Sequence, residues 1–182
     1  MPASNFSFVK NDVLRQNLDE ALDHVVTLLP FSESDTYNDT ARSAFRKTII
    51  IYTASIVEAL LFYILDNKFN ADDISEHYAT WKLKDETILH KIDDKHKIVA
   101  GHYQKFDGDG NKTKLNLGQI SDFLKSKKVI SPAMYTKIDI VRKLRNDQHI
   151  GSHTVVKSYT EKDLEEAFSV ASVIKTFAKD NT

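Results

Sequence analysis

One apolar stretch, Ile49 to Leu65, limits most strongly what this chain of 182 residues can fold into. It is about one helical turn shorter than the ~20 apolar residues that a membrane span needs. It also carries Glu58 near its middle, and a charged side chain is costly inside a bilayer. We therefore expect a core helix of a globular fold, and no membrane association. Such a helix needs other helices to cover its apolar surface.

The composition is that of an ordinary globular protein and predicts a single domain over residues 1–182. The 25 basic and 26 acidic residues give a net charge of −1, so any contact with nucleic acid must be local. The chain has no cysteine, which excludes disulfides and thiolate chemistry and agrees with a reducing compartment. Residues 1–10 lack the pattern of a secretory signal. A cytoplasmic location is expected.

Helical periodicity is clearest in the first third of the chain. Apolar residues recur every three or four positions from a cap at Asn11 or Asp12 as far as Pro30, which should end the helix. The segment 31–38 reads as a polar connection. A second helix, beginning at Asp39 or Thr40, contains the apolar stretch. These two helices should form an antiparallel hairpin in the core.

The middle of the chain, residues 81–117, lacks helical periodicity. The turn residues 107–111, Asp-Gly-Asp-Gly-Asn, separate the segments 96–106 and 112–117 and predict a β-hairpin. A calcium loop is excluded because Lys112 and Gly118 stand where the required glycine and glutamate should be.

Helices are expected again at 119–127, from Pro132 or Ala133 to His149, and at 161–178, where Thr160 and Asp163 form a variant capping box. The predicted fold class is therefore mainly α. It is an up-and-down bundle of about five helices in one domain, with an insertion at 70–118 that holds the hairpin.

The only cluster that suggests chemistry lies at the end of the 132–149 helix, where Arg142, Arg145, Asn146 and His149 follow one another closely. On a helix, Arg142 and His149 are two turns apart, and Arg145 and His149 are i, i+4 neighbours. Arginines and a titratable imidazole on one face suit a phosphate and proton transfer beside it.

These residues resemble the HEPN superfamily, small α-helical domains of prokaryotic toxin, abortive-infection and RNA-processing systems. Arg142 and His149, with six residues between them, match its arginine–histidine signature. The apolar helix with Glu58 is similar to the glutamate-bearing second helix of many members. The order of elements is also similar outside residues 70–118. Whether Arg142 or Arg145 is the equivalent arginine stays open.

The resemblance implies metal-independent endoribonuclease activity, in which a ribose 2′-hydroxyl attacks the adjacent phosphate. His149 would move the proton, an arginine would hold the phosphate oxygens, Asn146 would orient either group, and Glu58 would have a supporting role. No cofactor is expected. The resemblance further implies a homodimer formed through the motif helix, with RNA as substrate and a neutralising protein as a further partner.

Three alternatives stay open from the residues alone. Arg142, Lys143 and Arg145 would serve equally as solvated salt-bridge partners, and Glu58 would pair with an arginine for structural reasons. A groove lined by these residues would also suit a non-catalytic module that binds RNA, a nucleotide or a protein. Metal sites at His149 with His153, or among His90, His96 and His102, are disfavoured because the ligand spacings do not match known sites.

Overall fold

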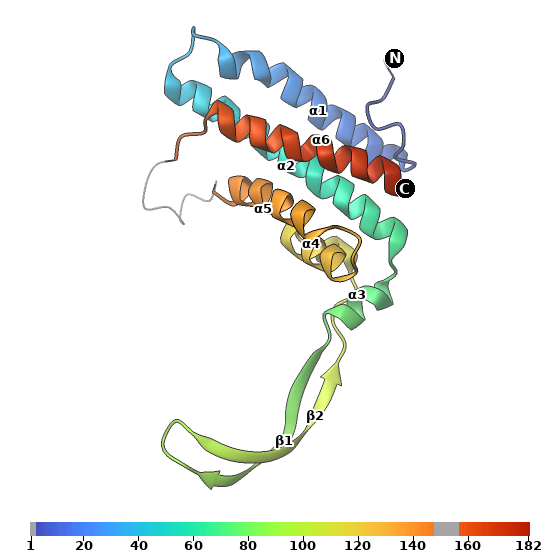
Figure 1. Ribbon diagram of the computed structural model, residues 1–182, viewed down its shortest axis with the longest axis vertical. Coiled ribbons are helices and arrows are strands. Elements are labelled where there is room, and N and C mark those ends of the chain that lie inside the picture. Colours follow the sequence, from blue (N-terminus) through green and yellow to red (C-terminus); the bar gives the residue numbers. More distant parts are fainter. Residues whose placement is uncertain (1–2, 148–156) are drawn as a thin grey trace. The chain divides into compact units, whose positions relative to one another are not determined.

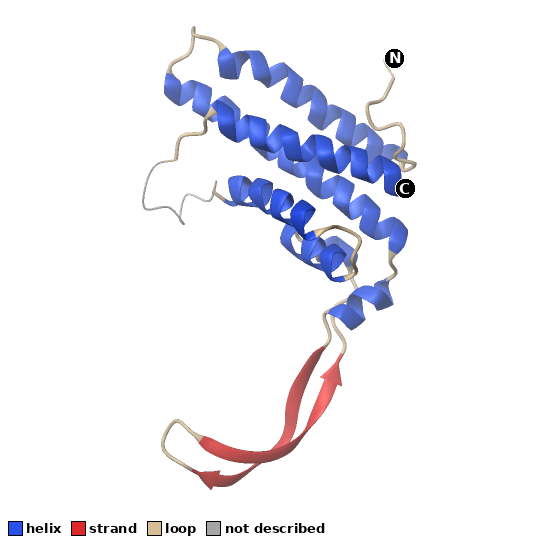
Figure 2. Ribbon diagram, viewed as in Figure 1, coloured by secondary structure: helices blue, strands red, loops and turns tan. Residues whose placement is uncertain are grey.

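The computed structural model describes residues 3–147 and 157–182, and these residues are mainly helical with one antiparallel hairpin (Figures 1 and 2). The expected mainly α class with a two-stranded hairpin is therefore confirmed. The chain forms two compact units. A helical bundle is made of Met1–Lys68 and Leu115–Thr182, and a smaller unit is made of Phe69–Lys114.

In the described part of the bundle there are five α-helices: α1 (Asp12–Glu33), α2 (Asp39–Lys68), α4 (Leu117–Ser126), α5 (Pro132–Asn146) and α6 (Glu161–Asn181). α1 runs antiparallel to α2, and α5 runs opposite in direction to both α2 and α6 (Figure 1). One core cluster joins buried residues of α1, α2, α5 and α6: Val25, Ile49, Ile50, Leu144, Leu164 and Ala167. The up-and-down arrangement buries the apolar stripe of each helix against its neighbours.

α2 is the central helix, as its apolar sequence predicts. Eleven of its residues are buried, and Ile49, Ile50, Leu60 and Leu61 have no exposed surface. Among the described residues it is the one helix long and apolar enough to cross a membrane by length and composition, and 61% of its most apolar window is buried in the structure. This burial is what the core helix of a bundle requires.

Side-chain caps fix where the helices begin. Asn11 caps α1 by accepting a hydrogen bond from the Leu14 N–H at 3.0 Å. Thr160 and Asp163 form the expected capping box at the start of α6. Pro30, however, does not end α1, which continues to Glu33. Pro30 removes one N–H donor from the last turn of α1, but its carbonyl still accepts from the Ser34 N–H at 3.1 Å, so the turn after it forms.

The smaller unit contains α3 (Ala71–His77), the strands β1 (Thr80–Lys91) and β2 (Lys97–Phe106), and a short 3₁₀ turn at Lys112–Lys114. The hairpin turn lies between Lys91 and Lys97, so the predicted turn at 107–111 and the predicted second strand at 112–117 are wrong. Instead, the Asp93 carboxylate makes the turn by accepting from the N–H groups of Lys95 and His96 at 2.7 Å.

Residues 107–111 have a packing role. The Gly108 N–H donates to the Ser75 carbonyl at 3.0 Å, and the Ser75 hydroxyl donates to the Gly108 carbonyl at 2.8 Å. A Cβ at Gly108 would lie 2.7 Å from the Tyr78 Cβ, closer than real Cβ contacts. Glycine is required at this position because the chain passes close to α3. In the sequence alone, the same glycine is indistinguishable from one that makes a tight turn.

Candidate functional site

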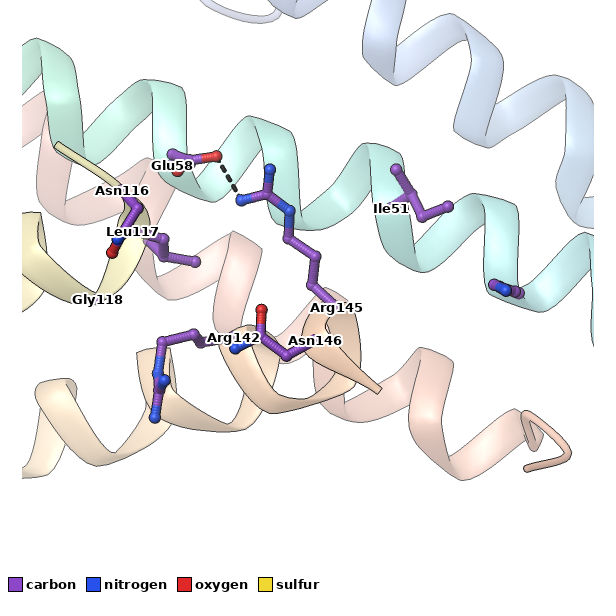
Figure 3. A pocket seen from close by; sticks show the side chains of 9 residues that line it. Ile51, Glu58, Asn116, Leu117, Gly118, Arg142, Arg145 and Asn146 are labelled. Atoms are coloured by element: carbon purple, nitrogen blue, oxygen red, sulfur yellow. Dashed lines mark hydrogen bonds and ion pairs between the residues drawn. The ribbon is translucent and has the colours of Figure 1, made fainter. Parts of the chain in front are cut away.

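A groove of about 620 Å³ opens on the bundle between α2, the beginning of α4 and the end of α5. Three cationic side chains, one carboxylate and two amides contribute its polar surface (Figure 3). Its lining residues are Lys47, Ile51, Glu58, Asn116, Leu117, Gly118, Arg142, Arg145 and Asn146. We refer to this feature as the α2–α5 groove. It contains every predicted site residue that the structure describes.

α2 supplies one wall of the groove through Lys47, Ile51 and Glu58. Their spacings of four and seven residues place them on one face of a helix. Within the described ranges, Lys47 lines the groove without an ion pair to another of its residues. The sequence analysis missed Lys47, although its helical spacing to Glu58 was a usable signal.

Arg145 reaches across the groove to Glu58, with 2.6 Å between its Nη1 and the carboxylate Oε2 (Figure 3). Both side chains are partly shielded from water, at 38% and 24% exposure. A guanidinium carries five N–H donors, and the contact with Glu58 uses Nη1. The pair therefore holds Arg145 in place while leaving donors for a bound oxyanion.

Arg142 is held differently, by a carboxylate of its own helix. Its Nε donates to Asp139 Oδ1 at 2.8 Å, and Lys143 contacts the other oxygen of the same carboxylate at 2.8 Å. The hydrogen bonds from Lys143 and Arg142 lower the pKa of Asp139 below its ordinary value. The guanidinium of Arg142 extends away from that of Arg145 (Figure 3). The two arginines thus line one groove without converging on one point.

The beginning of α4 forms the end of the groove nearest Arg142. Asn116 and Gln119 make a reciprocal capping box, each side chain accepting from the other's backbone N–H at 3.0 Å. The N–H groups of Leu117 and Gly118 belong to the first helical turn, where no partner exists within a helix. A Cβ at Gly118 would lie 3.2 Å from the Asn116 Oδ1 and in ordinary contact, at 3.4 Å, with the Arg142 Cδ, so the beginning of α4 packs closely beside Arg142.

Asn146 is the last residue of α5 and is exposed in the groove. Asp147 is the C-cap, and its N–H makes the last helical hydrogen bond, to the Lys143 carbonyl at 2.8 Å. α5 therefore ends at Asn146, earlier than the predicted end at His149. His149 itself lies outside the described residues, as does His153.

Residues on both sides of the segment 148–156 are tied together at the end of α5. Lys157 forms an ion pair with the Asp147 carboxylate, and the Tyr159 hydroxyl donates to the Asp147 carbonyl at 3.1 Å. Burial raises the pKa of Tyr159, so this hydroxyl remains a donor at neutral pH. Asp147, Lys157 and Tyr159 therefore lie together at the end of α5.

Two histidines of the smaller unit lie beside carboxylates of the hairpin. His96 contacts the Asp93 carboxylate at 2.9 Å in the hairpin turn, and His102 lies 3.3 Å from Asp85. Within the described ranges, no group of three or more histidine, aspartate or glutamate side chains is arranged to hold a metal ion.

Comparison with known proteins found no matching family model, curated protein or solved structure.

Proposed function

We propose that this chain is a HEPN-like domain that binds RNA in the α2–α5 groove and cleaves it without a metal ion. The observation that carries the proposal is the lining of the groove, which includes three cationic side chains, Lys47, Arg142 and Arg145, and one carboxylate, Glu58. A surplus of cations in a concave site favours an anionic ligand such as a phosphodiester. The first-turn N–H groups of α4 add donors of the same polarity.

Cleavage would use Arg142 and Arg145, which line the groove, and His149, which follows Asn146 by three residues in the sequence. The 2′-oxygen of a ribose attacks the adjacent phosphorus as His149 accepts the hydroxyl proton, and the bond from phosphorus to the 5′-oxygen breaks. The departing 5′-oxygen takes a proton from solvent water, which leaves a 2′,3′-cyclic phosphate and a 5′-hydroxyl. Guanidinium donors of Arg142 or Arg145 stabilise the charge that builds on the phosphate oxygens.

A homodimer would strengthen this site. In the proposed dimer, a two-fold axis near α5 relates the two copies, so that Arg142, Arg145 and His149 of both copies face the same RNA strand. Light scattering on the purified chain tests this part separately, since a monomer at assay concentration would remove the dimer from the proposal.

The test is incubation of the purified chain with mixed cellular RNA in EDTA. We expect cleavage, a 2′,3′-cyclic phosphate on the products by mass spectrometry, and a loss of at least about 100-fold in rate for His149→Ala. Lys137→Ala removes a cation from the exposed surface of α5 and serves as the matched control. Equal activity in His149→Ala and Lys137→Ala would refute the mechanism.

A non-catalytic module that binds RNA or a nucleotide is the second candidate. The observation that favours it is that both arginines are already paired, Arg145 with Glu58 and Arg142 with Asp139. In that case the wild type would bind RNA without cutting it, and Lys47→Ala would weaken binding more than Lys137→Ala does.

A further inference from the structure

The two faces of the β1–β2 hairpin differ in chemistry. Residues opposite one another in an antiparallel pair share a face, as do residues two apart in a strand. The observed register pairs Trp81 with Lys105, Leu83 with Tyr103, and Ile88 with Val99. One face, here called the aromatic face, therefore carries large apolar groups with a lysine beside them: Trp81, Leu83, Ile88, Val99, Tyr103 and Lys105.

The opposite face is organised around Phe106. The ammonium groups of Lys82 and Lys84 lie 5.4 and 5.1 Å from the centre of its ring. This contact agrees with the register, because Phe106, Lys82 and Lys84 belong to the other alternating set. The aromatic face has no comparable cover.

Exposure of the aromatic face is large. Trp81 is 63% exposed, Tyr103 66% and Ile88 58%. An isolated two-stranded hairpin is marginally stable in water, and contiguous exposed apolar groups mark interaction surfaces. The face therefore has the character of a binding surface, and its chemistry indicates the class of ligand.

Charge complements the aromatic groups. Residues 80–106 carry six lysines and four acidic residues, whereas the whole chain has one more acidic than basic residue. Lys105, opposite Trp81, contacts Glu76 at 4.0 Å, and both side chains are substantially exposed. An exposed pair at this distance contributes little stability, so a phosphate can readily replace the carboxylate.

We propose that the aromatic face binds single-stranded RNA, an inference that rests on the proposed function for the identity of the ligand. Trp81 on β1 and Tyr103 on β2 are diagonal neighbours, and the Cα atoms of such pairs are generally about 7–8 Å apart. The two rings stack on separate bases of one RNA strand. Lys105 contacts the backbone phosphate between them. Stacking of bases on aromatic rings beside basic groups is the general mode of single-strand binding.

Trp81 is the only tryptophan of the chain, so its fluorescence reports on this face alone. The experiment titrates the full chain, as the His149→Ala variant to prevent cleavage, with a mixed-sequence oligoribonucleotide. We expect quenching of the tryptophan emission and protection from acrylamide. Tyr103→Ala should weaken binding about tenfold. Gln104→Ala, the next residue on the opposite face, should leave binding unchanged.

The outcomes separate the hairpin from the groove. RNA cleavage by the wild type with no change in Trp81 emission would overturn the aromatic face as an RNA site and leave the proposed function standing. Quenching of Trp81 emission in the variant, with no RNA cleavage by the wild type, would support this site and refute catalysis. Emission that changes with protein concentration in the absence of RNA would show that a second copy covers the face, and this too would overturn the proposal. Equal weakening by Tyr103→Ala and Gln104→Ala would do the same.

Discussion

Replacing Glu58 with glutamine tests whether the ion pair across the groove stabilises the bundle. Glu58 and Arg145 are 24% and 38% exposed, between an exposed pair, which contributes about 0–1 kcal/mol, and a buried pair, whose disruption costs about 3–5 kcal/mol. The free energy of unfolding should therefore fall by about 1–2 kcal/mol. The loss arises because Arg145 keeps its desolvation cost and loses its charged partner.

Urea unfolding of four proteins isolates the pair: the wild type, Glu58→Gln, Arg145→Met and the double variant. We expect a coupling energy of about 1 kcal/mol between the two positions, and the double variant should be less destabilised than the sum of the singles. The more exposed pair Arg15–Asp12 on α1 is the matched control, with an expected coupling of at most about 0.5 kcal/mol. A coupling below about 0.3 kcal/mol at positions 58 and 145 would refute the reasoning.

Three further predictions concern stability. Leu60→Ala in α2 removes a fully buried side chain and should cost about 2–5 kcal/mol in urea unfolding, whereas Val13→Ala at a site with 69% exposure should change little. Thr160→Ala removes the capping box of α6 and should lower the unfolding free energy by about 1 kcal/mol; an unchanged midpoint would contradict the cap. The lowered pKa of Asp139 means that its contribution is present above the unfolded pKa of about 3.9 and is lost as pH falls through the folded pKa. Asp139→Asn should thus lose less stability than the wild type between pH 7 and pH 3, and parallel losses would count against the ion pairs.

Periodicity was sufficient to predict the bundle helices, because burial against a core imposes the helical repeat on the sequence. Periodicity was less informative where tertiary contacts determine the end of a helix or the position of a turn. The prolyl ring of Pro30 is accommodated in the last turn of α1, and Gly108 meets α3, a helix that the sequence analysis did not predict. The Asp93 turn uses a side-chain acceptor instead of a glycine pair, so the strongest local turn signal pointed to the wrong segment.

The part of the candidate site that lies on a single helix, α5, was predictable from the sequence. Arg142, Arg145 and Asn146 all line the groove, and the predicted supporting residue Glu58 pairs with Arg145. The spacing of Lys47 to Glu58 indicates a shared face of α2, but that this face meets α5 depends on the packing of the two helices. Sequence spacing within a helix reports on a shared face, but which faces meet is set by packing between helices.

The position of the smaller unit in the chain has a consequence for how the protein can vary. Phe69–Lys114 forms a separate compact unit between α2 and α4, which contact each other directly within the bundle. Closing a loop becomes costlier only logarithmically, by about 0.6 kcal/mol for each doubling of its length. The length and sequence of the hairpin can therefore change with little effect on the folding of the bundle. Specificity for a ligand and stability of the core are then free to vary as separate properties of one chain.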